Sequence, residues 1–257
     1  MRPATRFLNL LKEILRAFLL KTLSVGQYLA LMRWRGTLVD PDRVFVNQDH
    51  FLTILGNQKK TVFFIQIGAN DGVTHDPLHP IITKHHWRGI LVEPLPSHFE
   101  KLEKNYSEEP QLILENVAIA EQNSKLAFHY LPPQYNNPSW LQQIGTFDRH
   151  AIEFNLKASP ELIPHIETCY INAISLKNLA DKWNVSKVDL LVVDAEGYED
   201  KIIPQIKNLP SLPDYILFEW GCLERPILDG LVSSLEQRGY EVFSCGGDLL
   251  AARGAAG

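Results

Sequence analysis

The stretch FFIQIGANDG, residues 63–72, decides the fold of this chain. Together with Val62, its apolar half predicts a buried β-strand over 62–69, and Gly68 and Gly72 allow a tight turn whose backbone can approach a ligand without a Cβ atom in the way. A second apolar run, GILVEP at 89–94, brings Glu93 to a strand end. A glycine-containing turn after one strand and an acid after the next can hold a ribose in nucleotide-binding α/β folds.

The rest of the chain continues this alternation of apolar runs and helical stretches. The hairpin signal Gly246-Gly247 lies between two short apolar runs, YEVFSC and DLLAAR, and predicts that the last strand is antiparallel. Alternating strands and helices indicate an α/β fold with a parallel sheet wrapped by helices. Further strands are expected in 112–120, 125–132, 188–197 and 214–221, and helices in 77–86, after Pro96 and in 226–238. A strand followed by a helix with Ser175 as its N-cap is expected in 168–183.

Composition and charge limit the class of function. With 257 residues and 45% apolar content, the chain can form one large domain, which we place at 60–252 after a helical extension at 1–59. Residues 1–36 carry seven Lys or Arg and one acid, so the remainder of the chain is acidic and offers no broad basic face for nucleic acid. The three cysteines are far apart and lack zinc spacing, which is typical of reduced thiols in a cytoplasmic protein.

An amphipathic helix is expected at residues 5–23. Lys12, Glu13 and Arg16 interrupt its apolar residues, so it is too polar to span a membrane. We expect its apolar face to pack on the domain or on a second subunit. Peripheral binding to an anionic membrane surface is the alternative.

Residues 133–168 break the alternation with prolines, asparagines and aromatic residues. An insert of this kind usually forms a lid or a substrate-binding loop. Its aromatic side chains either stack on a substrate ring or form a small core of the insert itself. These side chains are Tyr135, Trp140, Phe147 and Phe154.

The first turn distinguishes between two cofactors that contain a ribose. It lacks the G-x-G-x-x-G pattern, and Asp71 would place a negative charge where the pyrophosphate of NAD needs bare N–H groups. S-adenosylmethionine has a sulfonium cation and no phosphate, and it tolerates that charge. The sequence therefore favours S-adenosylmethionine.

Five motifs together resemble the FkbM family of methyltransferases over roughly residues 60–250. The resemblance implies the Rossmann-like α/β fold of class I methyltransferases, a seven-stranded mostly parallel sheet with an antiparallel last strand and helices on both faces. It also implies methyl transfer to a hydroxyl, typically on a sugar, glycan or polyketide. It implies that Gly68, Asn70 and Asp71 line the methionine end of the cofactor, that Glu93 holds the ribose, and that Asn116 and Val117 flank the adenine. The motifs are FFIQIGANDG, GILVEPLPSHFEKLEKNY, ENVAIA, VDLLVVDAEGYE and LFEWG.

Two residues differ from the pattern of this resemblance. Gln66 stands where many class I methyltransferases have an acid that helps to hold the ammonium group of the cofactor. That contact must therefore come from elsewhere. Val192 stands two residues before Asp194, where many members of the resembled family have lysine.

Asp194 and Glu196 follow the central strand and are the candidates for catalysis. Methyl transfer needs alignment of the acceptor oxygen and a base for its proton, and Asp194 would be that base or orient the hydroxyl. Asp194 could instead cap the following helix. A further alternative is a divalent metal held by Asp194, Glu196 and Glu219, since hard cations prefer carboxylates.

Other predictions concern residues and functions outside this site. The histidines His75, His79, His85 and His86 are expected at solvated positions. Two alternative functions remain: a non-catalytic binding or assembly module on the same fold, and an NAD-dependent oxidoreductase.

Overall fold

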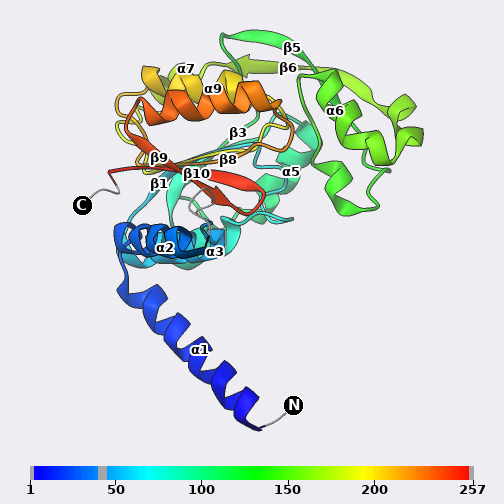
Figure 1. The fold of residues 1–257 in the computed structure, drawn as a ribbon. Helices are drawn as coiled ribbons and strands as arrows, with labels where there is room; N and C mark the ends of the chain where they lie inside the picture. Colours follow the sequence, from blue (N-terminus) through cyan, green and yellow to red (C-terminus); the bar gives the residue numbers. More distant parts are fainter. Residues whose placement is uncertain (1–2, 40–44, 255–257) are drawn as a thin grey trace.

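The computed structural model describes residues 3–39 and 45–254, and a seven-stranded sheet forms the centre of the molecule (Figure 1). The strand order is β3-β2-β1-β7-β8-β10-β9. The first five strands are parallel, and β10 is antiparallel to both of its neighbours, as predicted. The strands are β1 (Phe63–Ile67), β2 (Arg88–Val92), β3 (Leu112–Glu115), β7 (Leu190–Val193), β8 (Tyr215–Glu219), β9 (Tyr240–Cys245) and β10 (Asp248–Arg253).

Helices cover both faces of this sheet, which explains why the central strands are apolar throughout. Along β1, Phe64 packs into one hydrophobic core and Ile65 into the other, and both are fully buried. The first face carries α2 (Val25–Val39), α3 (Gln48–Gln58), α4 (His79–His85) and α5 (Pro96–Asn105). The second carries α7 (Leu176–Lys182), α8 (Glu199–Ile202) and α9 (Arg225–Glu236). Figure 1 shows α2 and α3 below the sheet and α7 and α9 above it.

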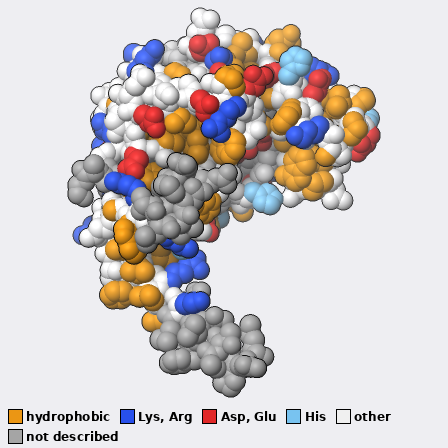
Figure 2. All heavy atoms as spheres, viewed as in Figure 1, with side chains coloured by type: hydrophobic (Ala, Val, Ile, Leu, Met, Phe, Trp, Pro, Cys, Tyr) orange, Lys and Arg blue, Asp and Glu red, His pale blue; other side chains and the backbone are white. Residues whose placement is uncertain are grey.

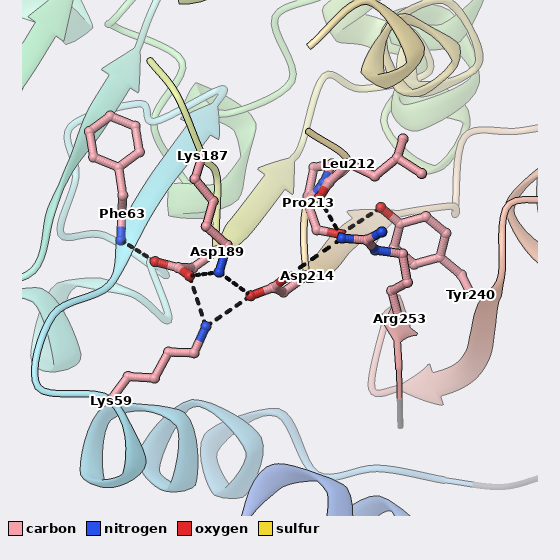
Figure 3. Close-up of polar contacts among 9 residues, drawn as sticks. All are labelled: Lys59, Phe63, Lys187, Asp189, Leu212, Pro213, Asp214, Tyr240 and Arg253. Carbon is pink, nitrogen blue, oxygen red and sulfur yellow. Dashed lines mark hydrogen bonds and ion pairs between the residues drawn. The ribbon is translucent and has the colours of Figure 1, made fainter. Parts of the chain in front are cut away.

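The ends of the strands opposite the predicted site are tied by an ion-pair network (Figure 3). Lys59 Nζ donates to Asp189 Oδ1 at 2.8 Å and to Asp214 Oδ2 at 2.9 Å, and Lys187 pairs with the same two carboxylates. Asp189 also accepts the N–H of Phe63 at 2.8 Å. Burial raises the pKa of Asp189, but the hydrogen bonds from Lys59, Phe63 and Lys187 outweigh it and leave that pKa lowered. The network joins the starts of β1, β7 and β8.

A second sheet of three strands lies beside the first. Its order is β4-β6-β5, with β4 at Ala118–Ile119, β5 at Ser124–Tyr130 and β6 at Glu167–Ile174. The single strand predicted over 112–120 is therefore wrong: it divides at Asn116, whose side-chain amide donates to the carbonyl oxygens of Glu93 and Pro94. The strand predicted over 125–132 exists, but it pairs with β6 and not with the large sheet.

The insert at 133–168 folds into short helices around a core of its own. These are η1 (Ser139–Gln142), α6 (Arg149–Asn155), η2 (Leu156–Ala158) and η3 (Pro160–His165). The core residues Leu141, Ile152 and Leu156 are almost completely buried. The insert is therefore a small packed unit.

The N-terminal helix α1 (Pro3–Thr22) projects away from the sheet in Figure 1. Its described apolar side chains Ile14, Leu15 and Phe18 are 57%, 58% and 61% exposed, so this part of the helix does not pack on the domain. Its last turn touches α3, where Asn57 donates to the carbonyl oxygen of Leu20. The helix itself is confirmed. In the part of the chain that the structure describes, no helix combines the length and apolar character needed to cross a bilayer.

Candidate functional site

The turn after β1 brings two strand ends into direct contact. Gly68 has φ +81°, and a Cβ atom at this position would lie 1.8 Å from the carbonyl oxygen of Asp194, at the end of β7. The N–H groups of Gly68 and Ala69 both donate to Val92 at the end of β2. Only glycine allows so close an approach of the three strand ends.

Glu93 follows β2 and fixes the shape of this turn. Its side chain is 5% exposed, and its two oxygens accept the N–H groups of Asn70 and Leu95, each at 2.8 Å. Burial raises the pKa of Glu93 to about 7, although both hydrogen bonds act against the rise. Each carboxylate oxygen retains a second lone pair for a ligand hydroxyl.

A cavity of about 280 Å³ opens at the carboxyl ends of the parallel strands. This is the position at which open α/β sheets bind ligands. Its walls also include Phe128 of β5 and Gln143 and Phe147 of the insert, so the second sheet and the insert close one side. The remaining polar lining residues are Gln48, Gln66, Asn70, Thr74, His75, Asp76, Glu93, His98, Asp194, Tyr198, Glu219 and Asp248.

The structure places four of the predicted site residues on this cavity: Gly68, Asn70, Glu93 and Asp194. The roles that the sequence assigns to them stay predictions, but their convergence from three strand ends agrees with a common ligand. Gly68 and Asp194 are 126 positions apart in the chain, but they meet because the carboxyl ends of neighbouring parallel strands lie at one edge of the sheet.

The other predicted cofactor residues point elsewhere. Asp71 accepts hydrogen bonds from Val73 and Thr74 within its own loop. Gly72 lies under Tyr106, whose hydroxyl donates to its carbonyl oxygen.

Asn116 and Val117, which were predicted to flank the adenine, also do not line the cavity. Asn116 bonds to the chain after β2, and Val117 packs against the second hydrophobic core. Their neighbours Ala118 and Ile119 line the cavity in their place.

An acidic group closes the β7–β8 side of the cavity. The side chain of Asp194 is open to the cavity, and one of its oxygens lies within 4.8 Å of a carboxylate oxygen of Glu219. Enclosure by the protein, followed by the charges of Glu196, Glu219 and Glu199, raises the pKa of Asp194 well above its usual value. Such a carboxyl group is a stronger base than a solvated one, as proton abstraction at neutral pH requires.

Glu196 lies in the turn between β7 and α8, Glu199 begins α8, and the hydrogen bonds of both side chains stabilise this turn. Glu196 has φ +50° and accepts a hydrogen bond from Asn155 of α6 at 2.8 Å. It faces the insert and does not line the cavity. Glu199 is almost fully buried, and its oxygens accept the N–H groups of Ala195 and Gly197. The predicted catalytic place of Glu196 is thus not on the cavity wall.

The carboxylates also allow the metal alternative to be examined. Ligand atoms of Asp194, Glu199 and Glu219 lie within 4.8 Å of one another, as do those of Glu196, Glu219 and Cys222. Both oxygens of Glu199 accept backbone N–H groups and each keeps a second lone pair, so the first set offers three carboxylates to a cation. A divalent metal here stays a prediction.

The histidines and the aromatic residues of the insert have separate places. His75 lines the cavity and contacts Ser139 Oγ at 3.2 Å, whereas His86 pairs with Glu109 at the surface. Of the four predicted aromatic residues, Phe147 lines the cavity and packs edge-on against Phe128. The remaining three lie off the cavity: Tyr135 stacks on His165, and Trp140 and Phe154 are exposed.

Further polar residues complete the cavity wall, and among those described next only Gln66 is singled out by the sequence. Gln48 at the start of α3 donates to Asp248 at the start of β10 at 3.2 Å, and both line the cavity. His98 is 5% exposed, and burial lowers its pKa to about 4, so it is neutral. Gln66 is equally buried, and its Oε1 has no hydrogen-bond partner among the described residues. A buried acceptor left open on a cavity wall indicates a ligand with a donor, which fits a cofactor carrying an ammonium group.

Comparisons with known proteins agree with this geometry. A sequence profile described as a methyltransferase FkbM domain matches residues 66–242. The crystal structure of methyltransferase FkbM from Methylobacillus flagellatus KT is 12% identical at a TM-score of 0.48, and the match covers 75% of this chain and 44% of that one. This chain therefore spans less than half of that protein.

Two further solved structures match this chain with similarly low identity and TM-score. The METTL16 MTase domain is 14% identical at a TM-score of 0.44, with 79% of this chain and 65% of that chain covered. The Methanococcus jannaschii fibrillarin pre-rRNA processing protein is 13% identical at a TM-score of 0.39, with 76% and 67% covered. Comparison with curated proteins finds no significant match.

Proposed function

Since the chain belongs to the FkbM family of methyltransferases, we propose that it transfers the methyl group of S-adenosylmethionine to a hydroxyl on a sugar, glycan or polyketide-type acceptor. The observation that carries the proposal is the position of Glu93. Its buried carboxylate lies on the wall of the cavity, next to the turn of Gly68, where it can accept hydrogen bonds from both hydroxyls of a ribose.

The residues around the cavity divide the work of such a reaction. The cofactor supplies an electrophilic methyl group when bound. Asp194, whose side chain is open to the cavity, accepts the proton of the acceptor hydroxyl. Phe128 of β5 and the insert residues on the cavity wall, including Phe147, exclude water and hold the acceptor in line.

Calorimetric titration with S-adenosylhomocysteine and, separately, with NAD tests the cofactor. We expect the first to bind to the wild type and to lose at least tenfold in affinity in Glu93→Ala, because one charge-assisted hydrogen bond contributes about 1.5–3 kcal/mol. Glu103→Ala on the exposed face of α5 is the matched control and keeps the affinity.

Each other outcome has a clear meaning. Binding of NAD alone would replace the methyltransferase with an oxidoreductase. Binding of neither compound would favour the non-catalytic module. For the chemistry, Asp194→Asn should keep cofactor affinity and lose turnover on glycan and polyketide acceptors; unchanged turnover would remove Asp194 from the role of base.

A further inference from the structure

The side chain of Gln66 is a buried amide whose NH₂ group has a hydrogen-bond partner and whose oxygen has none among the described residues. It lies in β1, two residues before the turn of Gly68. Its Nε2 donates to Asp76 Oδ2 at 3.3 Å. Because a carboxylate only accepts hydrogen bonds, the NH₂ group must face Asp76, and Oε1 is then turned away from it. That oxygen is buried and has no partner among the described residues.

Asp76 lies beside this amide on the same cavity wall. It comes from the loop before α4, ten residues after Gln66, and its Oδ1 accepts the N–H of Leu78 at 2.7 Å. This hydrogen bond occupies one oxygen of Asp76 and stabilises the loop. The second oxygen faces Gln66, and no lysine or arginine lines the cavity among the residues that the structure describes. A cation supplied by a ligand would stabilise the ionised form of this enclosed carboxylate.

The two side chains together form a small acceptor site. Gln66 contributes a neutral oxygen and Asp76 a charged group, and an alkylammonium ion has three N–H donors to satisfy. The site is on the same cavity as Glu93, the residue at the end of β2, which pairs with β1. A ligand with a ribose at one end and an ammonium at the other can therefore reach both.

We propose that Gln66 Oε1 and Asp76 bind the α-ammonium group of the methionyl part of the cofactor, with the acid supplied by the loop before α4 and not by β1. This rests on the proposed function and explains how the chain manages with glutamine in place of the strand acid. Asp76 here is a binding residue.

Two thioether ligands test this site separately from the rest of the cavity. S-adenosylhomocysteine carries the amino-acid part, whereas 5′-methylthioadenosine has the same adenosine and sulfur but no ammonium. We expect Asp76→Asn to weaken S-adenosylhomocysteine about 10- to 100-fold in calorimetric titration, the loss of one charge-assisted contact, and to leave methylthioadenosine within about twofold. Asp229→Asn on the exposed face of α9 is the matched control and changes neither affinity.

A charge swap makes the test independent of folding defects. In the double variant Gln66→Glu, Asp76→Asn, the carboxylate moves to the strand and the amide to the loop, so the same pair of groups is kept. We expect it to recover most of the affinity for S-adenosylhomocysteine that Asp76→Asn loses.

Three results would overturn the inference. Equal losses for both thioethers in Asp76→Asn, or no loss for either, would show that Asp76 only shapes the loop. Failure of the double variant to recover affinity would exclude the paired site. A wild type that binds neither thioether would instead overturn the proposed function itself, and the inference with it.

Discussion

Replacing Gly68 with alanine tests whether the ends of β1 and β7 touch as the structure shows. The new Cβ would lie 1.8 Å from the carbonyl oxygen of Asp194, which is backbone and cannot rotate away. The strands would have to separate, which breaks the hydrogen bond from the Asp194 N–H to Ile67 at 3.0 Å. The change therefore adds steric overlap to the cost of a positive φ.

The size of the effect follows from three contributions. Alanine at positive φ costs about 1–2 kcal/mol, overpacking against a rigid neighbour about 2–3 kcal/mol, and the lost hydrogen bond about 1 kcal/mol. The free energy of unfolding should thus fall by about 4–6 kcal/mol, which lowers the melting temperature by about 8–24 °C in a chain of this size.

Gly239→Ala is the matched control for this prediction. Gly239 has φ +84°, close to the +81° of Gly68, but its Cβ would meet nothing within 4 Å. It should lose only the conformational contribution, about 1–2 kcal/mol. Urea and thermal unfolding of both variants measure the difference. If the two losses agree within about 1 kcal/mol, the error of such comparisons, the close approach of the strands is wrong.

Three further predictions concern other parts of the molecule. Lys59→Met should lower the free energy of unfolding by about 1–2 kcal/mol in urea, because it removes one of three cations from the network in Figure 3, whereas exposed Lys60→Met should change it by less than about 0.5 kcal/mol. Burial raises the pKa of Glu199 to about 7 and that of Glu196 to about 8, so between pH 5 and 8 the folded state holds protons that these carboxyl groups release in the unfolded state. The free energy of unfolding should therefore be greatest near pH 5 and fall as the pH rises to 8.5. A urea midpoint that rises with pH would contradict this. The protein should co-sediment with vesicles that contain anionic lipid, because the exposed apolar side of α1 and its basic residues, visible together in Figure 2, can bind the membrane surface, and Phe18→Glu should abolish this binding. A protein that forms a concentration-dependent dimer and does not bind vesicles would indicate that a second subunit covers this helix.

The large sheet could be predicted because its signals are local. Each central strand is a short apolar run, and Gly68 and Glu93 follow directly after two of them, so chain order alone places them at one edge. The second sheet could not be predicted in the same way. Its two long strands are expected from the sequence, but β5 pairs with β6 across 36 intervening residues (131–166), and no local signal indicates that these strands pair with each other and not with the large sheet.

The fine structure of the site depends on conformation that sequence spacing does not express. Asp194 and Glu196 look equivalent in VDAEG, but the left-handed conformation of Glu196 turns it toward Asn155, while Asp194 stays on the cavity. Gln66 was recognised as an unusual residue, but its partner Asp76 was not, because the loop that brings them together has no periodic pattern. Contacts of this kind depend on the whole fold.

The hydrogen bond between Gln48 and Asp248 has a consequence for how the protein matures. These residues close the same cavity from positions 200 apart, so the wall is complete only after nearly all of the described chain has been synthesised and folded. A nascent or prematurely terminated chain that lacks β10 would lack the last strand that pairs with β8 and one side of the cavity. Ligand would then stabilise the complete chain against unfolding and proteolysis, and would stabilise a chain that lacks β10 less.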